Sequence, residues 1–487
     1  MAINSAIKLR SVFRVVSWLI LLEGAFLVLP LAVSLIYGES DWWTFVVAIG
    51  CALVAGGSGT FLLRRSSPKL HRLDAYLLTT LIWICYSLIG MIPFALGPHG
   101  IDVTSAFFET MSGFTTTGAS VFQDVESLSH GILFWRGLTQ WIGGLGIVLF
   151  ILAVLPALNR DGGISMFNAE MTGITHDKLH PRIRQTAMSL WLVYLVLTVV
   201  MILLLWLGPM NLFDSVCHTF ATLSTGGFST HNSSITSFGS HYVAIVVTIF
   251  MLIGGVNFAL LYNAARGKVR ALFRDTVFRT FIGIVLVLYV LMVAAVWLKG
   301  DLESTGDILI QPLFIIASAI TTTGFTYGDF TAWGSFVLCL IFLMMFSGAC
   351  AGSTTGAIKI DRLIAVGKSL RNEMMLTLFP NRLTRVDISG RQIPTGKLRR
   401  VALFIILYFV LIGLGTMAAT ISGLDFTDAF FASASCTGNN GLGYGATANS
   451  YGSLAPWLKW IFSFLMLTGR LELFTVLAIF TPSFWRE

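Results

Sequence analysis

The stretch FFETMSGFTTTGAS, residues 107–120, places three threonines and a glycine directly after an apolar run. The tetrapeptide TTTG returns at residues 321–324, after the short apolar run IIASAI. An apolar run too short to cross a membrane, followed by a polar segment with glycine, predicts a half-length helix that ends in a turn. Further copies of this pattern at a regular spacing would indicate an internal repeat.

The composition is that of a membrane protein. Of the 487 residues, 55% are hydrophobic and 11% are charged, and the mean hydropathy is +0.81. A soluble chain of this length needs more polar surface, so we predict an all-α polytopic membrane protein in contact with lipid. Ten apolar runs are long enough to be spans: 12–36, 42–63, 73–96, 132–157, 186–208, 241–264, 276–298, 334–363, 401–422 and 456–480.

The net charge of +7 does not indicate a nucleic-acid partner, because the basic residues follow the pattern of the spans. In a ten-span arrangement with a cytoplasmic N-terminus, 27 of the 31 Lys and Arg residues fall on the cytoplasmic side. Short cytoplasmic loops of membrane proteins are rich in Lys and Arg. This distribution predicts a multi-pass protein of the cell membrane with both termini in the cytoplasm.

The TTTG pattern has four versions, which predicts a fourfold repeat of span, half-helix, polar turn and span, with the first two spans outside it. The short runs begin near Thr104 and Ser105, Asp214, Pro312 and Asp428. The turns are TTTGAS (115–120), LSTGGF (223–228), TTTGFT (321–326) and TGNNGLG (437–443). The expected units are 1–70 for the N-terminal pair of spans and 71–160, 181–266, 272–366 and 395–482 for the repeats.

The turns align on a shared glycine, which gives Gly118, Gly226, Gly324 and Gly441. Half-helices that stop inside the membrane with their C-terminal ends at one axis favour a cation there. Glycine allows four backbones to crowd together, and rings of carbonyl oxygens replace the hydration shell of an alkali ion. Gly and Thr also serve close helix packing in membranes, but four copies at a period of about a hundred residues favour a pore.

The chain resembles the Trk/Ktr/plant high-affinity potassium transporter superfamily, and within it the bacterial TrkH type. The motifs that carry the resemblance, besides the four turns, are RGLTQWIGGLGIVLFILAVLP (136–156), GGVNFALLYN (254–263) and SGACAGSTTGAIKIDR (347–362). The resemblance implies potassium uptake in a bacterial inner membrane, a homodimer with one pore in each subunit, and a cytosolic nucleotide-binding regulatory ring of the TrkA type.

The resemblance also implies which residues hold potassium through their backbone carbonyls. These are Thr116, Thr117, Ser224, Thr225, Thr322, Thr323, Asn439 and Asn440. In this family a serine at the first filter glycine accompanies sodium selectivity, so Gly118 favours potassium. No Walker or GxGxxG pattern occurs, so we expect no nucleotide site in this chain.

Two further features are candidates for a gate. Gly348, Gly352 and Gly356 are spaced four apart in SGACAGSTTG, which fits either a packing face of a helix or an unwound segment. The resemblance favours an unwound gate loop, with Lys359 at its cytoplasmic end. Arg470 lies inside the last span, where a charge faces a cavity or a partner. The resemblance places it in the pore below the filter; a buried carboxylate or a lipid headgroup is the alternative partner.

Other functions remain open at this point. A sodium- or proton-coupled potassium symporter and a weakly selective monovalent-cation channel fit the same four turns. A carrier with broken helices would instead show inverted repeats. A membrane-embedded enzyme is disfavoured because the sequence has no HExxH or GxSxG motif and no paired intramembrane aspartates.

Overall fold

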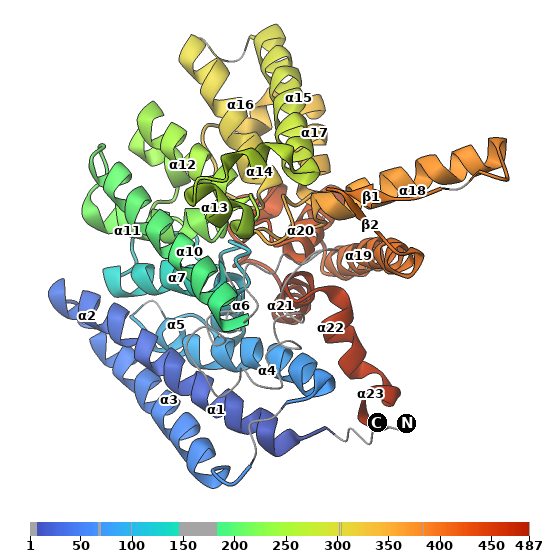
Figure 1. The fold of residues 1–487 in the computed structure, drawn as a ribbon. Coiled ribbons are helices and arrows are strands. Elements are labelled where there is room, and N and C mark those ends of the chain that lie inside the picture. Colours follow the sequence, from blue (N-terminus) through green and yellow to red (C-terminus); the bar gives the residue numbers. More distant parts are fainter. Residues whose placement is uncertain are drawn as a thin grey trace.

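The structure is a computed structural model that describes residues 7–66, 70–98, 100–144, 146, 183–300, 302, 304–382 and 384–486. Over these residues it is helical apart from one two-stranded hairpin, β1 (Asp387–Ile388) and β2 (Arg391–Gln392). Figure 1 shows the helices grouped around a common centre. The prediction of an all-α polytopic membrane protein is confirmed.

The first two predicted spans form a pair outside the repeats. They are α1 (Leu9–Phe26) with its continuation α2 (Val28–Ile36), and α3 (Trp42–Leu62). Small residues let α1 and α3 approach closely: a Cβ on Gly24 would lie 3.0 Å from the Cβ of Ala52. This N-terminal hairpin lies beside α4 (Arg72–Gly90), the first helix of the repeats (Figure 1).

Four repeats follow, each with a long helix, a short helix and a returning helix. The long helices are α4, α10 (Ile183–Trp206), α15 (Thr276–Lys299) and α19 (Thr395–Ile421). The short helices are α6 (Val103–Phe114), α11 (Leu212–Leu223), α16 (Thr305–Ile320) and α20 (Phe426–Gly438). The returning helices are α7 (His130–Gly144), α12 (His241–Gly254), α17 (Ser335–Phe346) and α21 (Pro456–Arg470).

Shorter elements connect these helices. They are α5 (Ile92–Leu96), η2 (Ser234–Phe238), α13 (Phe258–Ala265), α14 (Val269–Arg274), η3 (Phe330–Trp333), α18 (Ile360–Leu378), η4 (Gly445–Thr447), α22 (Leu473–Leu477), η5 (Ala478–Phe480) and α23 (Pro482–Arg486). Between the short helix and the returning helix of each repeat, the chain forms an extended segment with turns or a 3-10 helix.

Eight of the ten predicted spans match helices of spanning length and composition. In the described part of the chain, six are continuous and two are bent pairs, α12 with α13 at 105° and α21 with α22 and η5 at 116°. The predicted span 132–157 begins as α7, and its residues 145 and 147–157 lie outside the described residues. The predicted span 334–363 is interrupted, because α17 ends at Phe346 and α18 begins at Ile360.

The two sharp bends were missed by the sequence analysis because long-range contacts define them. After α12, Asn257 accepts from the Ala259 N–H at 2.8 Å and caps α13, and its side-chain amide donates to the Ala351 carbonyl at 2.8 Å. After α21, Glu472 has a left-handed backbone with φ of 58° and forms an ion pair with Arg362. The hydropathy of a continuous apolar run contains no trace of either contact.

The starts of three short helices agree with the prediction to within a few residues. Asp102 caps α6 by accepting from the Ser105 N–H at 3.1 Å, and Asn211 caps α11. The predicted start of the short helix of the third repeat, at Pro312, is wrong. This helix, α16, begins at Thr305, and Pro312 lies inside it. Proline removes one helical hydrogen bond and so weakens a helix there, but it does not always end one.

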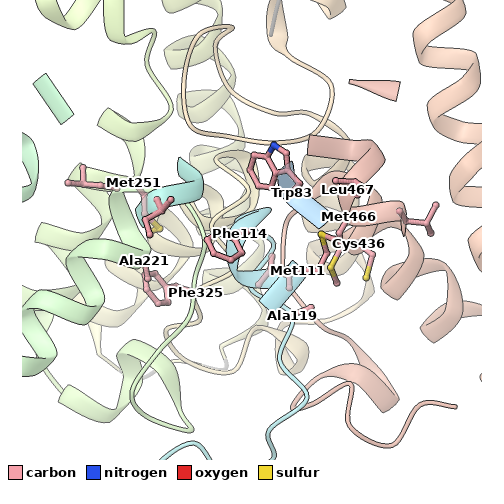
Figure 2. Packing of buried hydrophobic residues seen from close by; sticks show 14 of the residues in the cluster. Trp83, Met111, Phe114, Ala119, Ala221, Met251, Phe325, Cys436, Met466 and Leu467 are labelled. Atoms are coloured by element: carbon pink, nitrogen blue, oxygen red, sulfur yellow. The ribbon is translucent and has the colours of Figure 1, made fainter. Parts of the chain in front are cut away.

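The short helices are packed in apolar surroundings at the centre of the molecule. Figure 2 shows Met111 and Phe114 of α6 between Ala221 of α11 and Cys436 of α20. All four side chains are at most 1% exposed. The burial of their C-terminal halves fixes where these helix ends meet.

Candidate functional site: a ring of four turns

All four short helices end in the same hydrogen-bonded turn. In each turn one backbone N–H donates to the carbonyl five residues earlier. The four bonds run from Thr117 to Ser112 (2.9 Å), Gly226 to Ala221 (2.8 Å), Thr323 to Ser318 (2.8 Å) and Asn440 to Ser435 (3.0 Å). This is the Schellman motif, which satisfies a carbonyl that the helix end leaves open and reverses the chain. The shared bond aligns the repeats independently of their sequences.

The residue before each donor has a left-handed backbone, although none of the four is glycine. These residues are Thr116 (φ 52°), Thr225 (55°), Thr322 (54°) and Asn439 (52°). Asparagine tolerates this conformation, whereas a β-branched residue adopts it only under constraint, at a cost of roughly 1–3 kcal/mol. All four are buried, so the surrounding packing imposes the turns.

One residue beyond each donor stands a glycine that contacts the next repeat. We call Gly118, Gly227, Gly324 and Gly441 the ring glycines; their φ values are 84°, 80°, 84° and 78°. A Cβ atom added to each of them, in this order, would lie very close to a backbone carbonyl oxygen of another repeat. The distances are 2.1 Å to Gly226, 1.8 Å to Thr323, 2.5 Å to Asn440 and 2.2 Å to Thr117. The contacts pass from the first repeat to the fourth and back to the first. The four turns therefore form a closed ring, and a side chain at any of these positions would displace the neighbouring backbone.

The ring corrects the sequence alignment in the second repeat. Gly226 takes the place of Thr117, Thr323 and Asn440 in the hydrogen-bond pattern, and Gly227 takes the place of the predicted filter glycine. The alignment was one residue out because LSTGGF offers two glycines and sequence spacing does not distinguish them. In the corrected alignment Thr225 and Gly226 precede the ring glycine, and Ser224 lies closer to the helix end.

A buried ion pair supports the first turn. Glu109 on α6 is fully buried, and its carboxylate accepts from the Arg136 Nε at 2.9 Å, the Ser120 hydroxyl at 3.0 Å and the Val121 N–H at 2.8 Å. The Arg136 Nη1 also donates to the Ser229 carbonyl at 3.0 Å and so connects the first repeat to the second. The segments that follow both turns are held by these two charges.

Side-chain amides and hydroxyls support the other turns. Gln140 of α7 donates to the Gly226 carbonyl at 2.8 Å and accepts from the Phe228 N–H at 3.0 Å. Asn439 donates to the Thr117 hydroxyl at 3.0 Å and to the Met466 carbonyl at 2.9 Å, and Asn440 donates to the Ala319 carbonyl at 2.8 Å. We did not predict Glu109, Arg136 or Gln140. Polar residues within apolar helices were the available signal.

On one side the ring opens to a wide cavity, the vestibule, of about 1060 Å³. All four ring glycines contribute to its wall, together with polar residues such as Gln123, Asn232 and Asp329. Asn232 connects the segments after the first and second turns, because it donates to Asp124 at 2.9 Å and accepts from the Val125 N–H at 2.8 Å. Backbone and polar side chains therefore line the cavity directly above the ring.

On the other side lies the inner loop, residues 347–359, between α17 and α18. Its ends pair, since the Gly348 N–H donates to the Ile358 carbonyl at 2.8 Å. Gly352 has a φ of 74°, and a Cβ on Gly356 would lie 2.3 Å from the Gly438 carbonyl oxygen. The glycines therefore permit a folded loop under the fourth turn, and the interpretation as one helical packing face is wrong.

Two residues of the inner loop bond to the ring itself. The Gly356 N–H donates to the Thr322 hydroxyl at 2.8 Å. The Thr354 hydroxyl lies within hydrogen-bond distance of the Leu223 carbonyl at 3.1 Å and the Thr225 hydroxyl at 3.3 Å. Both left-handed threonines of the second and third repeats thus contact the loop.

Arg470 joins the inner loop to α7. Its guanidinium donates to the Thr354 carbonyl at 2.7 Å and to the carbonyls of Gly143 at 2.6 Å and Gly144 at 2.8 Å. Lys359 is buried and folds back on the loop, donating to both the carbonyl and the hydroxyl of Thr355. Arg470 and Lys359, together with Gly144 and Thr355, line an inner cavity of only about 50 Å³.

A ring of backbone between a wide and a narrow cavity, at the centre of a helical membrane protein, indicates a transport protein. Comparison with known proteins agrees. The profile of the TrkH family, described as a cation transport protein, matches residues 44–486. The Trk system potassium uptake protein TrkH of Escherichia coli (strain K12) is 36% identical over 481 residues, 98% of this chain and 99% of that one.

Two further relatives extend the comparison. The Trk system potassium uptake protein TrkG of the same strain is 33% identical over 98% of this chain and 99% of its own length. The crystal structure of the potassium transporter TrkH from Vibrio parahaemolyticus superposes with a TM-score of 0.90 at 33% identity, covering 98% of this chain and 100% of that chain. The chain belongs to the TrkH family of cation transport proteins.

Proposed function

We propose that this chain takes up potassium through the ring of four turns. The observation that carries the proposal is the closed ring, in which four equivalent turns bring four helix C-terminal ends and four glycines together. Each helix end contributes about half a negative charge, which favours a cation at the centre. The relatives named as potassium uptake proteins support potassium as that cation.

The proposed ligands are backbone carbonyls of the two residues before each ring glycine. They are Thr116 and Thr117, Thr225 and Gly226, Thr322 and Thr323, and Asn439 and Asn440. Carbonyl oxygens at fixed spacing replace the hydration shell of an alkali ion. The glycine at position 118, where a serine accompanies sodium selectivity in this family, supports potassium over sodium.

The inner loop and Arg470 form the proposed gate. Thr354, Gly356 and Arg470 hold the loop directly beneath the ring, on the side where the cavity is small. A cation leaving the ring on that side has to pass the loop and a guanidinium. Movement of the loop therefore opens the pathway, and Lys359 at its end gives it a fixed hinge on α18.

In this proposal the protein lies in a bacterial inner membrane. Its vestibule faces the outside, and its inner loop faces the cytosol. The distribution of Lys and Arg supports this orientation, with both termini in the cytoplasm. Following the family resemblance, we further propose a homodimer with one pathway per subunit and control of the inner loop by a cytosolic nucleotide-binding ring of the TrkA type.

Ion flux into proteoliposomes tests the proposal. The purified protein should conduct potassium and rubidium well and sodium and lithium poorly. If potassium flux stops when no sodium or proton gradient is present, the protein is a coupled symporter and not a pore. Equal flux of all four cations would contradict a selective ring and would indicate a weakly selective cation pathway.

A further inference from the structure

A glutamate is buried in the N-terminal hairpin, away from the ring. Glu23 lies near the end of α1 and is 0% exposed. Within the described part of the chain, neither of its carboxyl oxygens has a hydrogen-bond partner. A carboxyl group in the membrane-spanning part of a protein is costly and needs an explanation.

The carboxyl group lies where three helices meet. A Cβ on Gly90, at the end of α4, would lie 3.2 Å from the Glu23 Oε1, 2.9 Å from the Thr110 Cγ2 and 3.1 Å from the Phe114 Cε2. Thr110 and Phe114 belong to α6, whose C-terminal end forms the first turn of the ring. Glu23 therefore sits at the contact between the N-terminal hairpin and the first repeat.

The nearby polar groups are already occupied. The Thr110 hydroxyl donates to the Ala106 carbonyl at 2.7 Å, and the Gly90 carbonyl accepts from the Trp135 indole at 2.9 Å. The Tyr86 hydroxyl donates to the Leu19 carbonyl at 2.9 Å. No donor among these is left to stabilise a carboxylate.

The titratable groups around Glu23 do not supply a positive charge. From α4, Cys85 and Tyr86 face it, and both are neutral as ordinary side chains near pH 7. On α3, Cys51 is exposed. On α6, Glu109 is paired with Arg136. The described residues contain no ion pair with Glu23, and α2 has no titratable residue.

A buried ionised carboxylate with no hydrogen-bond donor or cation beside it is far less stable than the neutral acid. We infer that Glu23 is a proton-binding site inside the membrane, where a neutral carboxylic acid holds the N-terminal hairpin against the first repeat. Loss of the proton would place an unpaired charge at the contact of α1, α4 and α6. The hairpin and the first repeat therefore fit together best when the proton is bound.

Infrared spectroscopy of the wild-type protein tests the protonation directly. Reconstituted protein whose glutamates carry an isotope label in the side-chain carboxyl group should show the C=O stretch of a protonated carboxyl group at pH 8. The label should shift the frequency of this band. The band should be absent from the Glu23→Gln variant, which keeps the shape of the neutral acid. A wild-type spectrum without such a band, or a band unchanged in Glu23→Gln, would overturn the inference.

The pH dependence of stability is an independent measurement. A native state that keeps a proton which the unfolded chain loses becomes less stable as pH rises. Between pH 5 and 8, the unfolding equilibrium constant of the wild type should rise about tenfold per pH unit relative to Glu23→Gln. Glu373→Gln changes an exposed glutamate of α18 and should keep the wild-type dependence. Parallel curves for the wild type and Glu23→Gln would contradict a bound proton.

Discussion

The two sides of the ring are built in different ways. On the vestibule side, the ring glycines contact carbonyls of the next repeat, and a buried ion pair holds the segments above them. On the inner side, individual hydrogen bonds hold the loop. Thr354, Gly356 and Arg470 connect it to the turns and to α21. The bonds from the Cys350 N–H to the Gly255 carbonyl and from the Phe258 N–H to the Gly352 carbonyl, both 3.0 Å, connect it to the bend after α12. Packed backbone resists change, whereas individual hydrogen bonds contribute about 1 kcal/mol each and can be exchanged. The difference supports our proposal of a fixed selective region above a movable gate.

The largest predicted effect concerns the fixed side. Arg136→Met removes the partner of fully buried Glu109, and breaking a buried pair in this way costs about 3–5 kcal/mol. We expect a large loss of thermal stability and of folded protein. The double variant Arg136→Met with Glu109→Leu removes both charges and should recover much of the loss. Equal stability of the single variant and the wild type would show that the pair does not hold the vestibule side together.

The next effect concerns the inner side. A guanidinium about 8 Å from a passing cation, at an effective dielectric of about 20 to 80, opposes it by roughly 0.5–2 kcal/mol. Arg470→Ala also removes the bonds to Thr354, Gly143 and Gly144. Potassium flux should increase by a factor between a few and about thirty, and the potassium-to-sodium permeability ratio should stay nearly unchanged.

Arg470→Lys separates charge from hydrogen bonding. A lysine keeps the positive charge but not the planar arrangement of donors that reaches three carbonyls. If the bonds close the pathway, Arg470→Lys should increase flux almost as much as Arg470→Ala. Loss of stability with no gain in flux for Arg470→Ala would instead assign the arginine to a structural partner.

A smaller effect is expected for Thr354→Val, which removes the hydroxyl that bonds to Leu223, Gly254 and Thr225. Loss of about 1 kcal/mol from the closed loop should raise flux about fivefold. Ser353→Ala is the matched control, because in the part of the chain that the structure describes its hydroxyl bonds within the loop, to Cys350 at 2.6 Å and Thr355 at 2.8 Å. Equal potassium flux in Thr354→Val and Ser353→Ala would show that the bonds of Thr354 do not keep the pathway closed.

The smallest effect lies in the vestibule. The hydrogen bond from Asn232 lowers the pKa of Asp124 below its ordinary value. A lowered pKa adds stability above the unfolded value, near pH 4, and this stability is lost as pH falls through the folded pKa. Asn232→Ala should therefore weaken the acid sensitivity of the thermal midpoint between pH 5 and 3 slightly. An unchanged pH profile would mean that this contact carries no stability.

Much of the fold was predictable because apolar length and repeat period carry it. The four turns were visible as TTTG, LSTGG, TTTG and TGNNG, and the inner loop as a run of small residues. The ring position of Gly227 was not, since it depends on which backbone N–H reaches the Ala221 carbonyl. The bends at Asn257 and Glu472 also depend on partners about a hundred residues away, Ala351 and Arg362. Periodicity describes one helix at a time and contains no such contact.

The central claim is that the ring of glycines selects potassium, and the Gly118→Ser variant tests it most directly. A side chain at Gly118 would lie 2.1 Å from the Gly226 oxygen, so the carbonyls must move. Gly267→Ser is the matched control, because Gly267 has the same φ of 84° and, apart from its chain neighbours, no described residue lies within 4 Å of its Cβ position. In proteoliposomes, the potassium-to-sodium permeability ratio should fall at least tenfold for Gly118→Ser and stay at the wild-type value for Gly267→Ser. An unchanged ratio in folded Gly118→Ser protein would contradict selection by the ring.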